Sequence, residues 1–210
     1  MVRTFVRTRL TRDENSARTR RRLLRAARDV FLERGFHGTS LEAVAEEAGF
    51  SKGAVYSRFE SKADLFLALL YELNGERIET LRQYMSPARS AEDVETALKG
   101  WWADQMLANP SFQVAVTEYW SWAARDETVR QRISQEHEQM LASLAEVVDE
   151  TVDRLGVVLP CRSLDMVRVV GGLTRGLASE RQLNPELVDE RVIRWAMDSL
   201  VPGQTDRATA

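Results

Sequence analysis

Residues 39–65, T-S-L-E-A-V-A-E-E-A-G-F-S-K-G-A-V-Y-S-R-F-E-S-K-A-D-L, decide the fold of the N-terminal part of this chain. Apolar residues recur at helical spacing before Gly49, which suits the left-handed position after a helix. Ser51 is a good N-cap for a second short helix. Two short helices joined by such a turn predict a helix-turn-helix unit, whose second helix enters the DNA major groove.

The start of each helix in this stretch carries a capping signal. Thr39 and Glu42 have the spacing of a capping box, with Ser40 as the competing N-cap. Ser61 and Asp64 have the same spacing before a longer apolar stripe. The sequence therefore predicts two short helices followed by a longer one.

The run from residue 35 to residue 66 resembles the DNA-binding domain of the tetracycline-repressor (TetR) family in its cap, turn, aromatic and lysine positions. The resemblance covers about the first third of the chain. It implies a homodimer that binds DNA through the head and a small effector in the helical body. The DNA-contacting residues that it implies are Thr39, Ser51, Lys52, Gly53, Ala54, Tyr56, Arg58, Lys62 and, at the start of the first helix, Arg18.

These residues divide by expected role. By resemblance, Thr39, Tyr56 and Lys62 contact phosphates, whereas residues 52–54 face base edges. Arg58 stands where the family often has an aromatic residue or histidine, so its role stays open between phosphate, base and solvent. Phosphate contacts position a protein on DNA, and base contacts carry specificity.

Composition and charge favour a DNA-binding regulator. Residues 1–62 carry 14 Arg and Lys against 8 Asp and Glu, a net charge of +6, whereas the remainder carries 15 against 24. A basic head on an acidic body suits a protein that presents one end to DNA. With one cysteine, Cys161, no internal disulfide can form, which fits the cytoplasm. No apolar run approaches the ~20 residues of a membrane helix, and two separated histidines make a zinc site improbable.

The chain is expected to be all-α, with about nine helices. We expect an Arg-rich arm at 1–15, a helix-turn-helix domain at 16–62, and a helical ligand-binding and dimerisation domain at 63–210. The arm is either an unstructured leader or a segment that places arginines in the minor groove. Apart from the two short helices, the expected helices are 16–34, 61–84, 91–108, 111–124, 127–155, 163–182 and 185–200.

The body contains an aromatic-rich region between residues 101 and 122. Four of the five tryptophans lie there, and aromatic side chains with a few polar groups are typical of ligand pockets. Each of these residues could equally pack in the core, and His137 could be a packed histidine. The candidate ligand-binding residues are Trp101, Gln105, Met106, Glu118, Tyr119, Trp122, His137 and Met140.

The last two helices are apolar enough to form a two-fold helix–helix interface. Gly172 and Gly176 lie four residues apart on one helical face, where close packing would offset the cost of glycine, ~1 kcal/mol each. Packing within the chain explains them equally well.

The sequence thus predicts a homodimeric repressor that a largely apolar or aromatic ligand releases from a palindromic operator. The alternative is a DNA-binding regulator that is independent of ligand or controlled by another protein. An all-helical enzyme would need a titratable cluster in a pocket. The sequence shows no nucleophile–base pair, so we expect no catalytic residues, metal or cofactor, and no membrane association.

Overall fold

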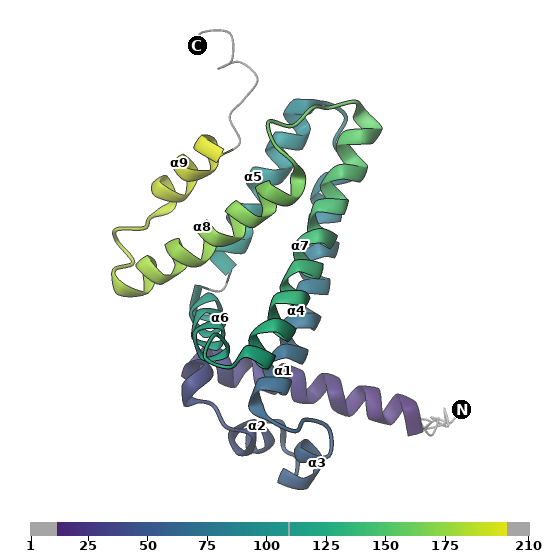
Figure 1. Cartoon of the computed structure of the whole chain (residues 1–210), viewed down its shortest axis with the longest axis vertical. Helices are drawn as coiled ribbons and strands as arrows, with labels where there is room; N and C mark the ends of the chain where they lie inside the picture. The colour runs from purple at the N-terminus through teal and green to yellow at the C-terminus, as the bar shows by residue number, and fades with distance from the viewer. Residues whose placement is uncertain (1–11, 109, 201–210) are drawn as a thin grey trace, which may run out of the picture.

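The structure, a computed structural model, describes residues 12–108 and 110–200 of the chain. Most of the expected arm, residues 1–11, lies outside these residues. The described part contains nine helices and no strand (Figure 1), as the sequence predicts. The helices are α1 (Arg12–Gly38), α2 (Leu41–Ala48), α3 (Lys52–Tyr56), α4 (Lys62–Met85), α5 (Ala91–Ala108), α6 (Pro110–Ala123), α7 (Glu127–Leu155), α8 (Ser163–Leu183) and α9 (Glu190–Leu200).

Local capping explains why the head forms. Ser40 is the N-cap of α2, and its Oγ accepts a hydrogen bond from the Ala43 amide at 3.1 Å. The Thr39–Glu42 capping box is therefore wrong, because the helix starts one residue later on the competing cap. The Ser61–Asp64 box is confirmed, since the Ser61 Oγ accepts from the Asp64 amide and donates to its Oδ2.

Helix α1 is longer than the sequence predicts and is kinked. It begins at Arg12 and continues beyond Gly35, the residue expected to end it. Gly35 has φ +67° and ψ −177°, a conformation essentially restricted to glycine. Gly35 therefore ends the regular helix, as the sequence predicts, and a short second helical segment continues to Gly38 beyond the kink.

The body is built around two long helices. Helices α4 and α7 pack side by side along the length of the molecule, from the head to its far end (Figure 1). Helix α8 packs on α7 and α6, and α9 packs on α5. Because α4 starts at the head and runs through the body, it connects the two parts directly.

Two apolar cores lie along this axis. The first joins the head helices to α6, and its members include Phe31, Phe66, Phe112 and Tyr119. The second holds α4, α5, α7, α8 and α9 together. Because α6 completes the core of the head, the head and the body pack against each other. The domain boundary expected at residue 62 stays a prediction.

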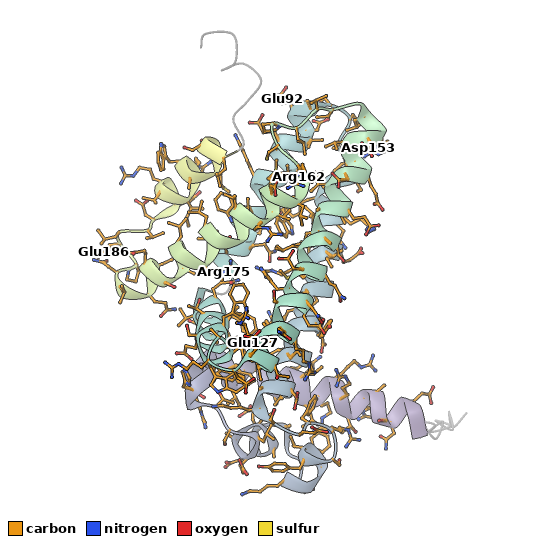
Figure 2. All side chains as sticks on the ribbon, viewed as in Figure 1. Glu92, Glu127, Asp153, Arg162, Arg175 and Glu186 are labelled. Carbon is orange, nitrogen blue, oxygen red and sulfur yellow. The ribbon has the colours of Figure 1, made fainter. Side chains whose placement is uncertain are left out.

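The start of the last helix differs from the expectation of residue 185. Residues 185–188 form turns, and α9 starts at Glu190. The Asp189 Oδ1 accepts from the Val192 amide at 3.0 Å and so caps the helix. Proline is tolerated at a helix start, but Asp189 supplies the better cap, and Glu186 stands in the turn before it (Figure 2).

Candidate nucleic-acid interface and effector pocket

Helix α3 presents the residues expected to read DNA. The Ser51 Oγ accepts from the Ala54 amide at 3.3 Å, and the buried Val55 anchors the helix to the core of the head. Lys52 and Gly53 are exposed on its first turn. A short helix held by one cap and one apolar anchor thus leaves its N-terminal residues free to approach base edges.

The two side chains that follow the recognition residues are held in place. The Tyr56 hydroxyl donates to the Glu42 Oε1 at 2.8 Å, and this bond lowers the pKa of Glu42 and raises that of Tyr56. The Arg58 guanidinium donates to the Ala54 carbonyl and the Ser57 Oγ, at the end of α3. Both side chains remain exposed, so each can also meet a phosphate.

Thr39 and Lys62 lie at the kinked end of α1. Thr39 is only 3% exposed, and its hydroxyl donates to the Gly35 carbonyl at 2.7 Å. The Lys62 Nζ donates to the carbonyls of Phe36, His37 and Thr39 at 2.9–3.1 Å. An ammonium has three protons to donate, so Lys62 is fully engaged in this conformation. Phosphate contact by either residue stays a prediction.

The body contributes one carboxylate to the same junction. The Glu118 Oε2, from α6, accepts from the Phe36 amide at 2.7 Å and from the His37 amide at 3.3 Å. The kink frees these two amides, and Glu118 satisfies them. The α1–α2 turn is thus held by Glu118 of α6, which accepts from its amides, and by Lys62 of α4, which donates to its carbonyls.

Several arginines of α1 lie beside the helix-turn-helix. Arg18 is exposed, as a phosphate contact requires. The Arg22 guanidinium donates to the Ala48 carbonyl and covers the Phe50 ring at 4.7 Å, and Arg20 lies over Phe59. These contacts hold α1 against α2 and α3 while keeping positive charge near the expected DNA surface.

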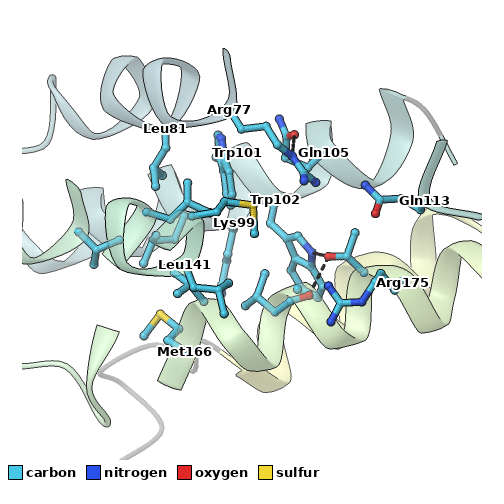
Figure 3. A pocket seen from close by; sticks show the side chains of 18 residues that line it. Arg77, Leu81, Lys99, Trp101, Trp102, Gln105, Gln113, Leu141, Met166 and Arg175 are labelled. Atoms are coloured by element: carbon cyan, nitrogen blue, oxygen red, sulfur yellow. Dashed lines mark hydrogen bonds between the residues drawn. The ribbon is translucent and has the colours of Figure 1, made fainter. Parts of the chain in front are cut away.

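The main pocket of the body lies between α4, α5, α7 and α8. Its cavity volume is about 70 Å³, and the space between its lining residues reaches about 800 Å³ when open solvent is included. Of the predicted ligand residues, Trp101, Gln105 and Met140 line it (Figure 3). His137 lines an adjoining pocket that shares Met140.

The other predicted ligand residues lie elsewhere. Met106 is buried in the second core. Tyr119 and Trp122 stack on each other and contact Phe36, next to Glu118, at the junction of head and body. Burial raises the pKa of Tyr119 to about 12. The sequence region expected to form one cavity thus divides between a pocket and a junction.

Sequence reasoning missed most of the pocket lining, including its two arginines. Arg77 and Arg175 line both the main and the adjoining pocket, with Gln113 between them on α6. A signal was present, because Arg77 interrupts an apolar spacing formed by Leu73 and Leu81, and Arg175 stands in the apolar pattern of α8. A charge on an otherwise apolar helical face indicates a buried group with a role.

His137 is uncharged at neutral pH. It packs edge-on against Trp120 at 4.6 Å, and burial, with the charge of Arg175 next, lowers its pKa to about 4. It can therefore offer the pocket one hydrogen-bond donor and one acceptor, without charge. No helix of the described part is long and apolar enough to cross a membrane.

A trihelical head with an exposed recognition helix, joined to a helical body with a pocket, defines the chain as a DNA-binding transcriptional regulator. The family profile described as "Bacterial regulatory proteins, tetR family" matches residues 23–69. The chain belongs to the tetracycline-repressor family.

Individual relatives agree with this family. The activator FasR of Mycolicibacterium smegmatis is 40% identical over 75 residues, which cover 36% of this chain and 32% of FasR. The fatty acid metabolism regulator protein of Bacillus subtilis is 23% identical over 180 residues, 84% of this chain and 82% of that protein. The structure of FadR from Bacillus subtilis in complex with stearoyl-CoA has a TM-score of 0.65 at 18% identity, covering 87% of this chain and 98% of that chain.

Proposed function

We propose that this regulator is a homodimeric repressor, released from a palindromic operator by a small, largely apolar ligand in the main pocket. The observation that carries the proposal is the course of α4. This helix starts beside the recognition unit, where Lys62 holds the α1–α2 turn, and further along it lines the pocket with Leu81. A ligand that favours one position of α4 therefore acts on the spacing of two heads.

The dimer is expected to form through α8, α9 and the turn between them. Exposed apolar side chains gather there, namely Val169, Leu183, Leu187 and Trp195. Gly172 and Gly176 are exposed on α8, and a Cβ at Gly176 would meet no described atom within 4 Å. The room beside these glycines supports close approach by a second copy. Two heads joined in this way would read half-sites one helical turn, about 34–36 Å, apart.

The DNA-contacting set predicted from the sequence includes Thr39, Ser51 and Lys62, whose polar groups are engaged within the head. This proposal rests on the six other members of that set. Lys52, Gly53 and Ala54 read base edges, while Tyr56, Arg58 and Arg18 position the head on phosphates. Their exposure and the net charge of residues 1–62 support these roles.

The lining of the pocket and the names of relatives support the proposed class of ligand. Its walls are mostly apolar, with Trp101 and Trp102 on one side and residues of α7 and α8 on the other. Two relatives are named as regulators of fatty acid metabolism or degradation, and one was solved with stearoyl-CoA. An acyl chain is therefore the first ligand class to test.

The test is a fluorescence-anisotropy titration against DNA from upstream of the protein's own gene and against a scrambled duplex, at two salt concentrations. We expect tight, sequence-dependent binding by two protomers per site, weakened by an acyl ligand. Ligand-independent binding would favour the alternative, a regulator without effector or under protein control. Binding strengthened by ligand would replace repressor release with activation, the mode named for FasR. Equal binding to both duplexes would contradict the proposal.

A further inference from the structure

The polar end of the main pocket contains two guanidinium groups that lack an acidic partner. Arg77 comes from α4 and Arg175 from α8, and both line the pocket together with Gln105 and Gln113 (Figure 3). The Arg77 Nε donates to the Gln105 Oε1 at 2.9 Å, and Arg175 lies 4.2 Å over the Trp120 ring. Within the described residues, neither arginine forms an ion pair.

Both arginines are partly buried, and leaving their charges unpaired is costly to the folded protein. Buried charges are normally paired, because removing them from water is expensive. Burial, with the charge of Arg175 next, lowers the pKa of Arg77 to about 10, and burial also lowers that of Arg175. Each arginine therefore disfavours the charge of the other.

The other charged groups near the pocket do not supply the missing anion. Lys99 also lines it, but Lys99 is paired with Glu95 at 2.6 Å and with Asp198 at 2.8 Å. Glu136 lines the adjoining pocket, where its Oε2 is buried without a hydrogen-bond partner and makes no ion pair with either arginine. The neutral His137 adds no negative charge. The polar end is thus left electropositive.

The remainder of the pocket is apolar and holds one free donor. The Nε1 of Trp101 is buried without a partner among the described residues, whereas the Nε1 of Trp102 donates to the Thr174 hydroxyl. Leu81, Leu141 and Met166 lie toward the end opposite Gln113 and Arg175 (Figure 3). The pocket therefore offers donors at one end and apolar surface at the other.

We propose that the effector is an amphiphile whose oxyanion head, a carboxylate or a phosphate, is held between Arg77 and Arg175 while its apolar tail fills the pocket. Guanidinium groups match both oxyanions with paired hydrogen bonds. This inference rests on the proposed function, because it assigns the chemistry of the same pocket.

The same geometry explains how the ligand acts on the head. The like charges of Arg77 on α4 and Arg175 on α8 repel each other across the pocket that both residues line. A bound oxyanion attracts both guanidinium groups. It therefore favours a conformation of the body in which α4 is drawn toward α8. Differential binding to that form is the requirement for a shift in conformation.

The experiment is calorimetric titration of the full-length protein with decanoate, decyl phosphate and decanol, which share one tail and differ in the head. We expect one or both anions to bind at least ten-fold more tightly than decanol. The anion that binds more tightly shows whether the pocket prefers a carboxylate or a phosphate. Arg77→Gln and Arg175→Gln should weaken that anion roughly 10- to 100-fold. Arg168→Gln is the matched control on α8, since Arg168 is exposed and paired with Glu138, and should change nothing.

A second readout separates ligand binding from a structural role. Removing an unpaired buried charge should leave the melting temperature of the ligand-free protein unchanged or raised. Equal binding of decanol and the anions, no binding of any probe, or unchanged affinity in both arginine variants would overturn the inference. Anion binding without release of operator DNA would leave this inference standing. It would contradict the proposed function, in which the ligand releases the protein from DNA.

Discussion

Gly35 is the residue on which the junction of head and body depends. It shares φ +67° with Gly49, but a Cβ at Gly35 would lie 2.7 Å from the Glu118 Oε2, whereas a Cβ at Gly49 would meet no described atom within 4 Å. We expect Gly35→Ala to reduce the free energy of unfolding by about 3 kcal/mol, and Gly49→Ala by only about 1 kcal/mol. Denaturant unfolding of both variants measures the difference, and equal losses would show that Glu118 yields without cost.

His137 gives the body a dependence on pH. Its folded pKa of about 4 lies below the ordinary value of 6.5, so folding favours the neutral form. That stability is present above pH 6.5 and is lost as the pH falls toward 4. Because the ring is partly exposed, we expect a loss on the order of 1 kcal/mol at pH 5, absent in His137→Gln. Thermal unfolding of both proteins at pH 7.5 and pH 5 tests this; parallel losses would assign the effect to other groups.

At the scale of elements, the two lysines of the head have different surroundings: Lys62 packs on the α1–α2 turn, whereas Lys52 lies on α3. Lys62 donates to three carbonyls that the end of α1 leaves free, whereas Lys52 is exposed. We expect Lys62→Met to lower the melting temperature and DNA affinity with little change in the salt dependence of binding. A phosphate contact would instead lower the slope of log K against log salt by about 0.9, and that result would restore the role implied by the family resemblance.

Lys52→Ala is the companion variant on α3. Because Lys52 is exposed, we expect unchanged stability and an altered preference among operator sequences. The measurement is anisotropy with the operator and with single-base variants of each half-site. A uniform loss of affinity on every duplex would place Lys52 on the phosphates.

At the scale of the whole molecule, the proposed function requires two copies of the chain, joined through α8 and α9. Trp195 on α9 is 71% exposed, and Val158 in the α7–α8 loop is 83% exposed. We expect Trp195→Glu to produce monomers in sedimentation velocity and to weaken operator binding, because one head reads only half of the site. Val158→Glu, at a still more exposed position outside α8, α9 and the turn between them, should remain dimeric. If the Trp195→Glu protein remained a dimer, the interface would have to lie on another surface.

The sequence determined the elements of this protein. Caps, turn glycines and apolar spacing are local signals, and they predicted the all-α class, the helix-turn-helix and the body helices. The exposure of Lys52 and Gly53 was predictable for the same reason, since it follows from one cap at Ser51 and one anchor at Val55.

Only the tertiary structure decided which distant residues meet. Glu118 was expected in a ligand cavity, but it satisfies the amides that the kink at Gly35 frees, 82 residues away from Phe36. Arg77 and Arg175 line one pocket because the packing of the helices brings α4 and α8 to the same cavity, and no spacing in the chain reports that proximity. Hydrogen-bond demand and desolvation are set by what surrounds a group in space. Local pattern therefore fixes helices, whereas the site depends on their packing.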